Sequence, residues 1–139
     1  MTNELLEESI KGLDRAKDAL SAAKHDLKGG FILAAANRAY YSMFYCANAL
    51  LHLKDINVKT HNGVRNKFSE TFIKTNILPA SLAEKLGDAY NLREEADYDL
   101  DASILPEEVK RIIDDASDFI RQTEEYIKGV KSEIRAQDL

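Results

Sequence analysis

The chain has 139 residues, of which 45% are apolar and 31% charged, and its formal net charge is −5. This balance is typical of one globular domain with a single core, and it excludes a disordered chain. With two prolines, six glycines and no apolar run of about 18 residues, we expect long helices in a single domain over residues 1–139 and no membrane span.

The first predicted helix runs from about Glu4 to Lys28, where apolar residues recur at three- to four-residue steps. Thr2 or Asn3 can cap its start, and Gly29-Gly30 is a strong helix end. The acidic residues around its start do not form a signal-peptide pattern. We therefore expect a cytoplasmic protein.

The second predicted helix, from about Phe31 to Lys54, contains AAANRAYYSMFYCANALL, which is apolar on almost every side. Such a helix belongs in the middle of a bundle. Arg38 within it must be paired or face a polar cavity, because an unpaired buried charge is very costly. Cys46 is the single cysteine, so it cannot form an internal disulfide, and its apolar neighbours predict a buried, unreactive thiol.

After a polar segment, a third helix is predicted over about residues 61–75. Pro79 and the sequence SLAE at 81–84, which is typical of a capping box, predict the start of a fourth helix that continues to about Tyr98. Pro106 begins a last helix with a long apolar stripe over residues 109–134. The sequence therefore predicts an all-α fold, an antiparallel bundle of four to five helices.

The charge is unevenly distributed along the chain. Residues 28–78 hold seven lysines and arginines against two acidic residues, whereas residues 79–101 sum to −5. A local basic surface attracts phosphates even on an acidic protein. The alternative is that the basic and acidic stretches pair with each other inside the bundle.

Several familiar chemistries have no counterpart in the sequence. There is no glycine-rich phosphate loop and no nucleophile elbow. His25, His52 and His61 are not spaced as a metal-binding pair on one helix, and one cysteine excludes a thiolate zinc site. We therefore expect no metal and no cofactor. The acidic run over residues 94–101 is either a site for a divalent ion or, as such runs usually are, a solvated helix end.

Two groups of polar side chains are candidates for a site. On the second helix, Arg38, Tyr41, Tyr45 and His52 share one face, and Asn37 and Tyr40 lie on its flanks. A guanidinium next to phenolic hydroxyls can bind a phosphate, and a tyrosine ring can stack on a base. The alternative is a buried Arg38 that is neutralised by a carboxylate of the fourth helix, with the tyrosines as packing.

On the fourth helix, Tyr90, Arg93 and Asp97 share a face and Tyr98 lies next to it. Arg93 and Asp97, four residues apart, are alternatively a simple ion pair. In the segment KTHNG, Lys59 and His61 lie at a helix start, which favours anions because its amides are unpaired. In the alternative, this segment contains a helix cap and no binding site.

Three segments, AANRAYYSMFYCANALL, KTHNGV and NLREEADYD, together resemble the HEPN family, small helical domains of higher eukaryotes and prokaryotes that are named for nucleotide binding. The resemblance covers about residues 5–127 and is closest to a stand-alone prokaryotic branch. It implies a helical bundle that commonly forms a homodimer around a cleft. It also implies a partner, because many members act as the toxin beside a minimal nucleotidyltransferase that serves as antitoxin.

Active members of this family are metal-independent ribonucleases with an arginine, four to six intervening residues and a histidine. Arg93 matches the arginine, but Tyr98 stands where the histidine is expected, and no histidine follows His61. An unperturbed tyrosine titrates near 10, so Tyr98 can orient a phosphate or protonate a leaving oxygen but is a poor general base. His61 would replace the missing base if the fold brings it to Arg93.

We therefore predict a cleft that binds RNA or a nucleotide phosphate and in which Arg38 and Arg93 converge. The predicted catalytic residues are Arg93 and Tyr98, and the other predicted cleft residues are Asn37, Arg38, Tyr41, Lys59, His61 and Asp97. The first alternative is a non-catalytic nucleotide-binding module that partners a nucleotidyltransferase or is modified by it on Tyr98. The second is a structural dimerisation bundle in which both arginines are fully neutralised.

Overall fold

The computed structural model describes residues 2–137, and within them it contains helices and no strand. The helical bundle confirms the predicted all-α fold. The elements in chain order are α1 (Asn3–Lys28), α2 (Ile32–Leu53), α3 (His61–Phe68), the short π-helix η1 (Ser69–Ile73), α4 (Ala80–Tyr98) and α5 (Pro106–Gln137).

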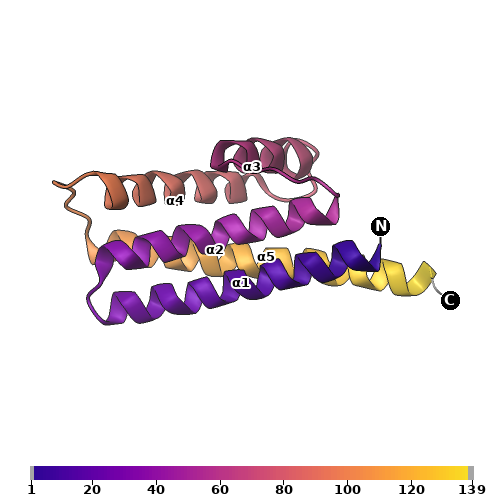
Figure 1. Cartoon of the computed structure of the whole chain (residues 1–139), viewed down its shortest axis with the longest axis horizontal. Helices are drawn as coiled ribbons and strands as arrows, with labels where there is room; N and C mark the ends of the chain where they lie inside the picture. Colours follow the sequence, from indigo (N-terminus) through magenta and orange to yellow (C-terminus); the bar gives the residue numbers. More distant parts are fainter. Residues whose placement is uncertain (1, 138–139) are drawn as a thin grey trace.

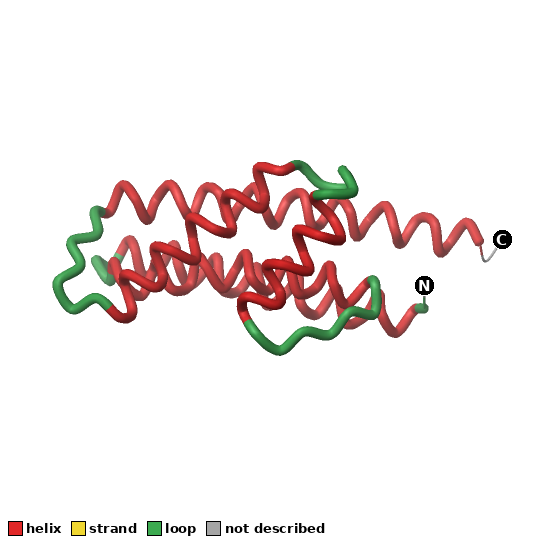
Figure 2. The backbone as a smooth tube through the Cα atoms, turned by 90° about the horizontal axis from the view of Figure 1, so that it is seen from above, coloured by secondary structure: helices red, strands yellow, loops and turns green. Residues whose placement is uncertain are grey.

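The helix α2 lies in the middle of the bundle. In Figure 1, α1, α2 and α5 run side by side along the long axis, while α4 and α3 lie on the other side of α2. Because α2 is covered by all the other α-helices, side chains on nearly every side of it are buried, including Tyr40, Met43 and Leu50. Figure 2 shows that the C-terminal part of α5 extends past the rest of the bundle, at the end where the N-terminus also lies.

Two threonine caps position the starts of α1 and α3. Leu5 N–H donates to Thr2 Oγ1 at 3.2 Å, and Gly63 N–H donates to Thr60 Oγ1 at 2.9 Å. A Cβ on Gly63 would lie only 2.3 Å from Val58 Cγ1, so the first turn of α3 packs tightly against the loop before it. This close approach holds His61, the first residue of α3, in a fixed position.

The predicted capping box at 81–84 is wrong. The helix α4 begins at Ala80, directly after Pro79, and the cap residue makes no side-chain hydrogen bond. The cap residue is Pro79 itself, whose backbone is extended (ψ 145°) and whose side chain has no oxygen to accept a hydrogen bond from the first amides, so α4 begins without a side-chain cap.

The predicted third helix is not one continuous α-helix. After Phe68 the helix widens into η1, in which Lys74 N–H donates to Ser69 O at 2.9 Å. The rings of Phe68 and Phe72 are both fully buried. The ring centre of Phe68 lies 5.5 Å from that of Phe119 of α5, and the ring centre of Phe72 lies 5.6 Å from that of Tyr126 of α5. The wider turn, η1, therefore occurs where two aromatic rings of this segment pack against α5.

Two smaller predictions concern Cys46 and membrane insertion. The Cys46 side chain is fully buried, and burial raises the pKa of its thiol to about 12. The thiol therefore stays protonated near neutral pH and is unreactive, as predicted. Over residues 2–137, none of the helices combines the length and the apolar character that a bilayer span requires.

Candidate functional site

Arg93 lies at the centre of a cluster of tyrosine rings between α4 and α2. Its side chain is only 6% exposed. The guanidinium carbon lies 5.1 Å from the ring centre of Tyr40, 5.3 Å from Tyr90, and 5.9 Å from each of Tyr41 and Tyr98. Aromatic faces attract cations, so four rings help to stabilise this buried charge.

Two carboxylates pair with the Arg93 guanidinium. Glu94 Oε1 lies 2.9 Å from Nη2 and Asp97 Oδ2 lies 3.5 Å from Nη1. Burial opposes the charge of Arg93, but Glu94, the neighbouring tyrosines and Asp97 outweigh it, and the pKa of Arg93 is raised. The buried Nε–H has no hydrogen-bond partner among the described residues. Part of the donor set of Arg93 is therefore unused within the chain.

Arg38 reaches the same cluster from α2. Its Nε and Nη2 donate to Asn37 Oδ1 at 3.1 and 2.9 Å, and Asn37 Nδ2 donates to Asp97 Oδ2 at 3.0 Å. The Arg38 guanidinium carbon lies 5.1 Å from the centre of the Tyr41 ring, which Arg93 also contacts. The two arginines therefore converge on one ring, and over residues 2–137 no carboxylate is within ion-pair distance of Arg38.

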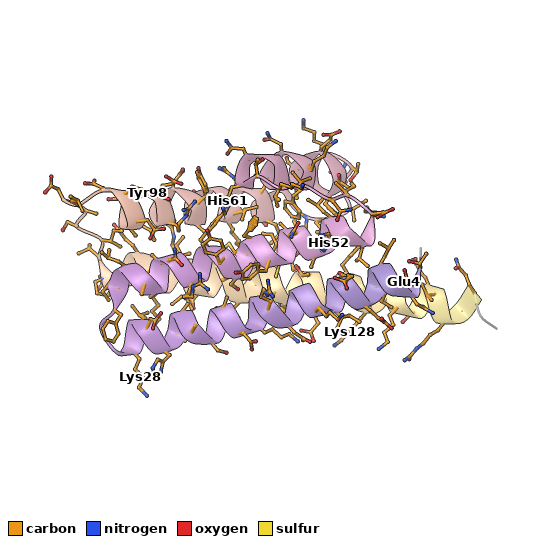
Figure 3. The ribbon with its side chains drawn as sticks, viewed as in Figure 1. Glu4, Lys28, His52, His61, Tyr98 and Lys128 are labelled. Atoms are coloured by element: carbon orange, nitrogen blue, oxygen red, sulfur yellow. The ribbon has the colours of Figure 1, made fainter. Side chains whose placement is uncertain are left out.

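His61 joins the cluster from the start of α3. Its Nδ1 lies 2.7 Å from Tyr40 Oη, and its ring centre lies 4.6 Å from that of Phe44. Figure 3 places His61 between α4 and α2. Since Arg93 also lies over the Tyr40 ring, the fold brings this histidine to the motif arginine.

The titration of both Tyr40 and His61 is shifted by this environment. Burial raises the pKa of Tyr40, so its hydroxyl stays protonated. Burial also lowers the pKa of His61, and the Arg93 guanidinium lowers it further against the opposing effect of Glu94. His61 is therefore neutral near pH 7, as a general base must be.

Two of the singled-out residues lie apart from this cluster. Lys59 is exposed and makes no ion pair or side-chain hydrogen bond over residues 2–137. His52 lies in a separate groove between α1 and α2. Tyr98 lies at the edge of the cluster: it is 71% exposed at the end of α4 (Figure 3), and its ring contacts Arg93.

The sequence analysis missed two contacts of this cluster. Tyr40 is the hydrogen-bond partner of His61 although twenty-one positions separate them, and no local pattern indicates such a pair. Glu94 pairs with Arg93, although consecutive helix residues do not face each other and the sequence therefore favours Asp97 instead.

Most of the positive charge of residues 28–78 is not neutralised by ion pairs. Over residues 2–137, one ion pair involves a lysine or arginine of residues 28–78, and it is Lys67–Glu70. Its acidic residue, Glu70, belongs to the same stretch. The alternative in which the basic and acidic stretches pair with each other is therefore not what the structure contains. The acidic run over residues 94–101 does not gather around a common point either, since Asp97 contacts Asn37 and Arg93.

Comparisons with known proteins agree with this architecture. The model of the family described as HEPN domain matches residues 11–126. Two similar proteins of Methanocaldococcus jannaschii carry the name "Putative toxin": one is 40% identical over 84% of this chain and 80% of its own length, and the other 33% identical over 94% and 97%. A UPF0332 protein of Thermotoga maritima is 32% identical over 84% of this chain and 89% of its own. Because the family model matches most of its residues and relatives above 30% identity cover most of its length, this chain belongs to the HEPN domain family.

Proposed function

We propose that this chain is the toxin of a toxin–antitoxin pair and cleaves RNA without a metal ion, with a minimal nucleotidyltransferase as its antitoxin. The single observation that carries the proposal is that Arg93 and His61 both contact Tyr40, Arg93 over its ring and His61 at its hydroxyl. A phosphate-binding cation and a neutral imidazole at one place are the groups that attack by a 2′-hydroxyl requires. The names of the two archaeal relatives support the toxin assignment. In this proposal the protein acts in the cytoplasm as a homodimer.

The proposed reaction assigns one step to each residue. Arg93 binds the phosphate and stabilises the charge that develops on its oxygens. With its proton on Nδ1, His61 donates to Tyr40 Oη and accepts the 2′-hydroxyl proton at Nε2. The 2′-oxygen bonds to phosphorus, the bond to the 5′-oxygen breaks, and the Tyr98 hydroxyl protonates that oxygen. The products are a 2′,3′-cyclic phosphate and a 5′-hydroxyl end. Water then carries the extra proton from His61 to Tyr98, which restores both side chains.

Incubation of the purified protein with tRNA and mRNA in EDTA tests this function. Cleavage products that end in a 2′,3′-cyclic phosphate are expected, because the attacking group belongs to the RNA itself. Intact RNA in EDTA, or products with a 3′-hydroxyl end, would contradict the proposal.

Replacing Glu94 by glutamine is expected to strengthen RNA binding about fivefold. Glu94 occupies Nη2 of Arg93, so a phosphate must displace it. Its side chain is 40% exposed, and a pair with such an exposed partner contributes about 1 kcal/mol or less. Affinity for a non-cleavable RNA at fixed salt is the measurement, with Glu125→Gln on α5 as control. Unchanged or weaker binding in Glu94→Gln would show that the phosphate does not compete for this guanidinium.

Tyr98 supports a second candidate function, in which the nucleotidyltransferase transfers a nucleotidyl group to this residue. The supporting observation is that Tyr98 is 71% exposed while its ring stays 5.9 Å from Arg93, so a modification there lies next to the phosphate-binding cation. Coexpression with a nucleotidyltransferase encoded beside the gene is expected to add one nucleotidyl mass to Tyr98, and Tyr98→Phe is expected to lose it. A mass shift that persists in Tyr98→Phe would assign the modification to another residue.

A further inference from the structure

A second polar surface lies in the groove between α1 and α2. The groove has a volume of about 270 Å³. Lys11 and Arg15 line it from α1 together with one carboxylate, Glu8, and Tyr45, Asn48 and His52 line it from α2. None of these side chains takes part in the reaction proposed above, so the groove needs an explanation of its own.

The floor of this groove is a close contact between the two helices. A Cβ on Gly12 would lie 2.8 Å from Ala49 Cβ, so α1 and α2 approach closely at that point. The longer side chains on either side of the contact rise above it and form the walls. The groove is therefore built by the helix packing and does not depend on one flexible side chain.

The groove offers positive charge and an aromatic face to a ligand. The Arg15 guanidinium carbon lies 5.7 Å from the Tyr45 ring centre, and over residues 2–137 Arg15 enters no ion pair. Lys11 pairs with Glu8 at 3.5 Å, but both side chains are more than half exposed, so the pair is weak. A ligand with negative charge and a planar ring matches these features.

The groove is continuous with the Arg93 cluster along α2. The ring centre of Tyr45 lies 5.8 Å from that of Tyr41, over which both Arg38 and Arg93 lie. Along α2, the distance from Arg38 to His52 is about 21 Å, at about 1.5 Å per residue. Of the cations along this row of rings, Arg15 and Arg38 enter no ion pair over residues 2–137. Aromatic rings next to such cations form the surface that single-stranded nucleic acids bind, because bases stack on rings and phosphates contact the cations.

We propose that the α1–α2 groove binds a single-stranded segment of RNA whose reacting phosphate lies at Arg93. One base stacks on Tyr45, and Arg15 and Lys11 contact phosphates. This inference rests on the RNA-binding function proposed above and adds the path of the strand beyond the reacting phosphate. The protein thus selects unpaired RNA that is several nucleotides long.

Binding of two labelled RNAs tests the groove separately from the Arg93 cluster. A dinucleotide and a hexanucleotide, both with 2′-O-methyl groups so that no hydroxyl attacks, are titrated into the full chain and followed by fluorescence anisotropy. Arg15→Ala and Tyr45→Leu are expected to weaken hexanucleotide binding at least fivefold, as about 1–3 kcal/mol of stacking predicts. Both variants are expected to leave dinucleotide binding unchanged, whereas Arg93→Ala weakens both RNAs.

The salt dependence of RNA binding is a readout that would not change if Arg15 had only a structural role. Loss of one phosphate contact is expected to make the slope of log affinity against log salt shallower by about 0.7 in Arg15→Ala. Arg135→Ala, which removes the same charge from the end of α5, is the matched control and is expected to keep the full slope. Melting temperatures show whether each variant is folded.

Three outcomes would overturn the inference. If the unaltered chain binds neither RNA, the proposed function fails and the groove proposal fails with it. If it binds the hexanucleotide and neither Arg15→Ala nor Tyr45→Leu changes the affinity, the groove proposal alone is wrong. If Arg15→Ala lowers the apparent mass in solution and leaves RNA binding intact, the groove is an interface between copies of this chain.

Discussion

Replacing Arg93 by alanine is expected to lower the rate of RNA cleavage at least about a hundredfold, the usual cost of removing one donor that stabilises a developing oxyanion. Arg93 lies over all four tyrosine rings, whereas Arg38 lies over Tyr41 and Arg65 over Tyr90, so neither of these two arginines replaces it. Single-turnover cleavage in EDTA measures the effect.

Because Arg93 is buried, its loss also affects folding, and a second variant separates the two effects. Arg93→Lys keeps the charge but loses the planar fork that binds two phosphate oxygens, so cleavage is expected to fall while RNA binding is largely kept. Arg111→Ala is the matched control, because Arg111 pairs with Asp88 on α4 and is 70% exposed. A folded Arg93→Ala protein that cleaves at the original rate would disprove the role of this residue.

Replacing His61 by alanine is expected to lower the cleavage rate by about a hundredfold to ten-thousandfold, the range typical of a general base. His61 accepts the proton only when it is neutral, so the rate falls as pH drops through the pKa of this histidine. Burial first, and the Arg93 guanidinium second, lower that pKa below the ordinary value. The acid limb of the pH–rate profile is therefore expected below about 6.5.

An NMR titration of the His61 ring checks the cause of this shift. In Arg93→Lys the nearby positive charge remains, so the pKa of His61 is expected to stay low, whereas in a folded Arg93→Ala it is expected to rise toward the ordinary value. His25→Ala, which changes an exposed histidine at the end of α1, is the control and is expected to keep the original profile. A pH profile that is unchanged in His61→Ala would assign the base to another group.

The same shift affects stability. A neutral His61 with a lowered pKa binds fewer protons in the folded state than in the unfolded state. The stability contributed by the neutral ring is therefore present above the unfolded pKa, about 6.5, and is lost as pH falls through that value toward the lower folded pKa. Acid thus weakens the site and the fold around it together.

Much of the helical arrangement was predictable from local pattern. The all-round apolar character of residues 34–51 predicted a central helix, and α2 is covered on all sides. The four-residue spacing of Arg93 and Asp97 predicted a shared face, and the two side chains form an ion pair. Both predictions use a repeat of 3.6 residues that is set by the backbone, so neither needs knowledge of distant residues.

The exact starts of the helices were less predictable from the sequence. Thr60 caps α3 as the sequence indicated. Pro79 and the pattern at 81–84 correctly indicated a helix start near residue 80, but Ser81 does not form the predicted cap, because α4 begins before it at Ala80. Lys59 lies one residue from the Thr60 cap and still does not join the cluster, because its side chain lies exposed on the loop.

By itself the amino-acid sequence determined the bundle, its central helix, and the presence of an arginine and a tyrosine at the positions of a family motif. Only the tertiary structure decided that His61 stands beside Tyr40 and Arg93, and that Glu94 competes for the guanidinium. Local periodicity orients side chains around one helix axis, whereas the distance between residues on different helices depends on loop paths and packing. Only those paths and that packing place a neutral imidazole next to a buried cation.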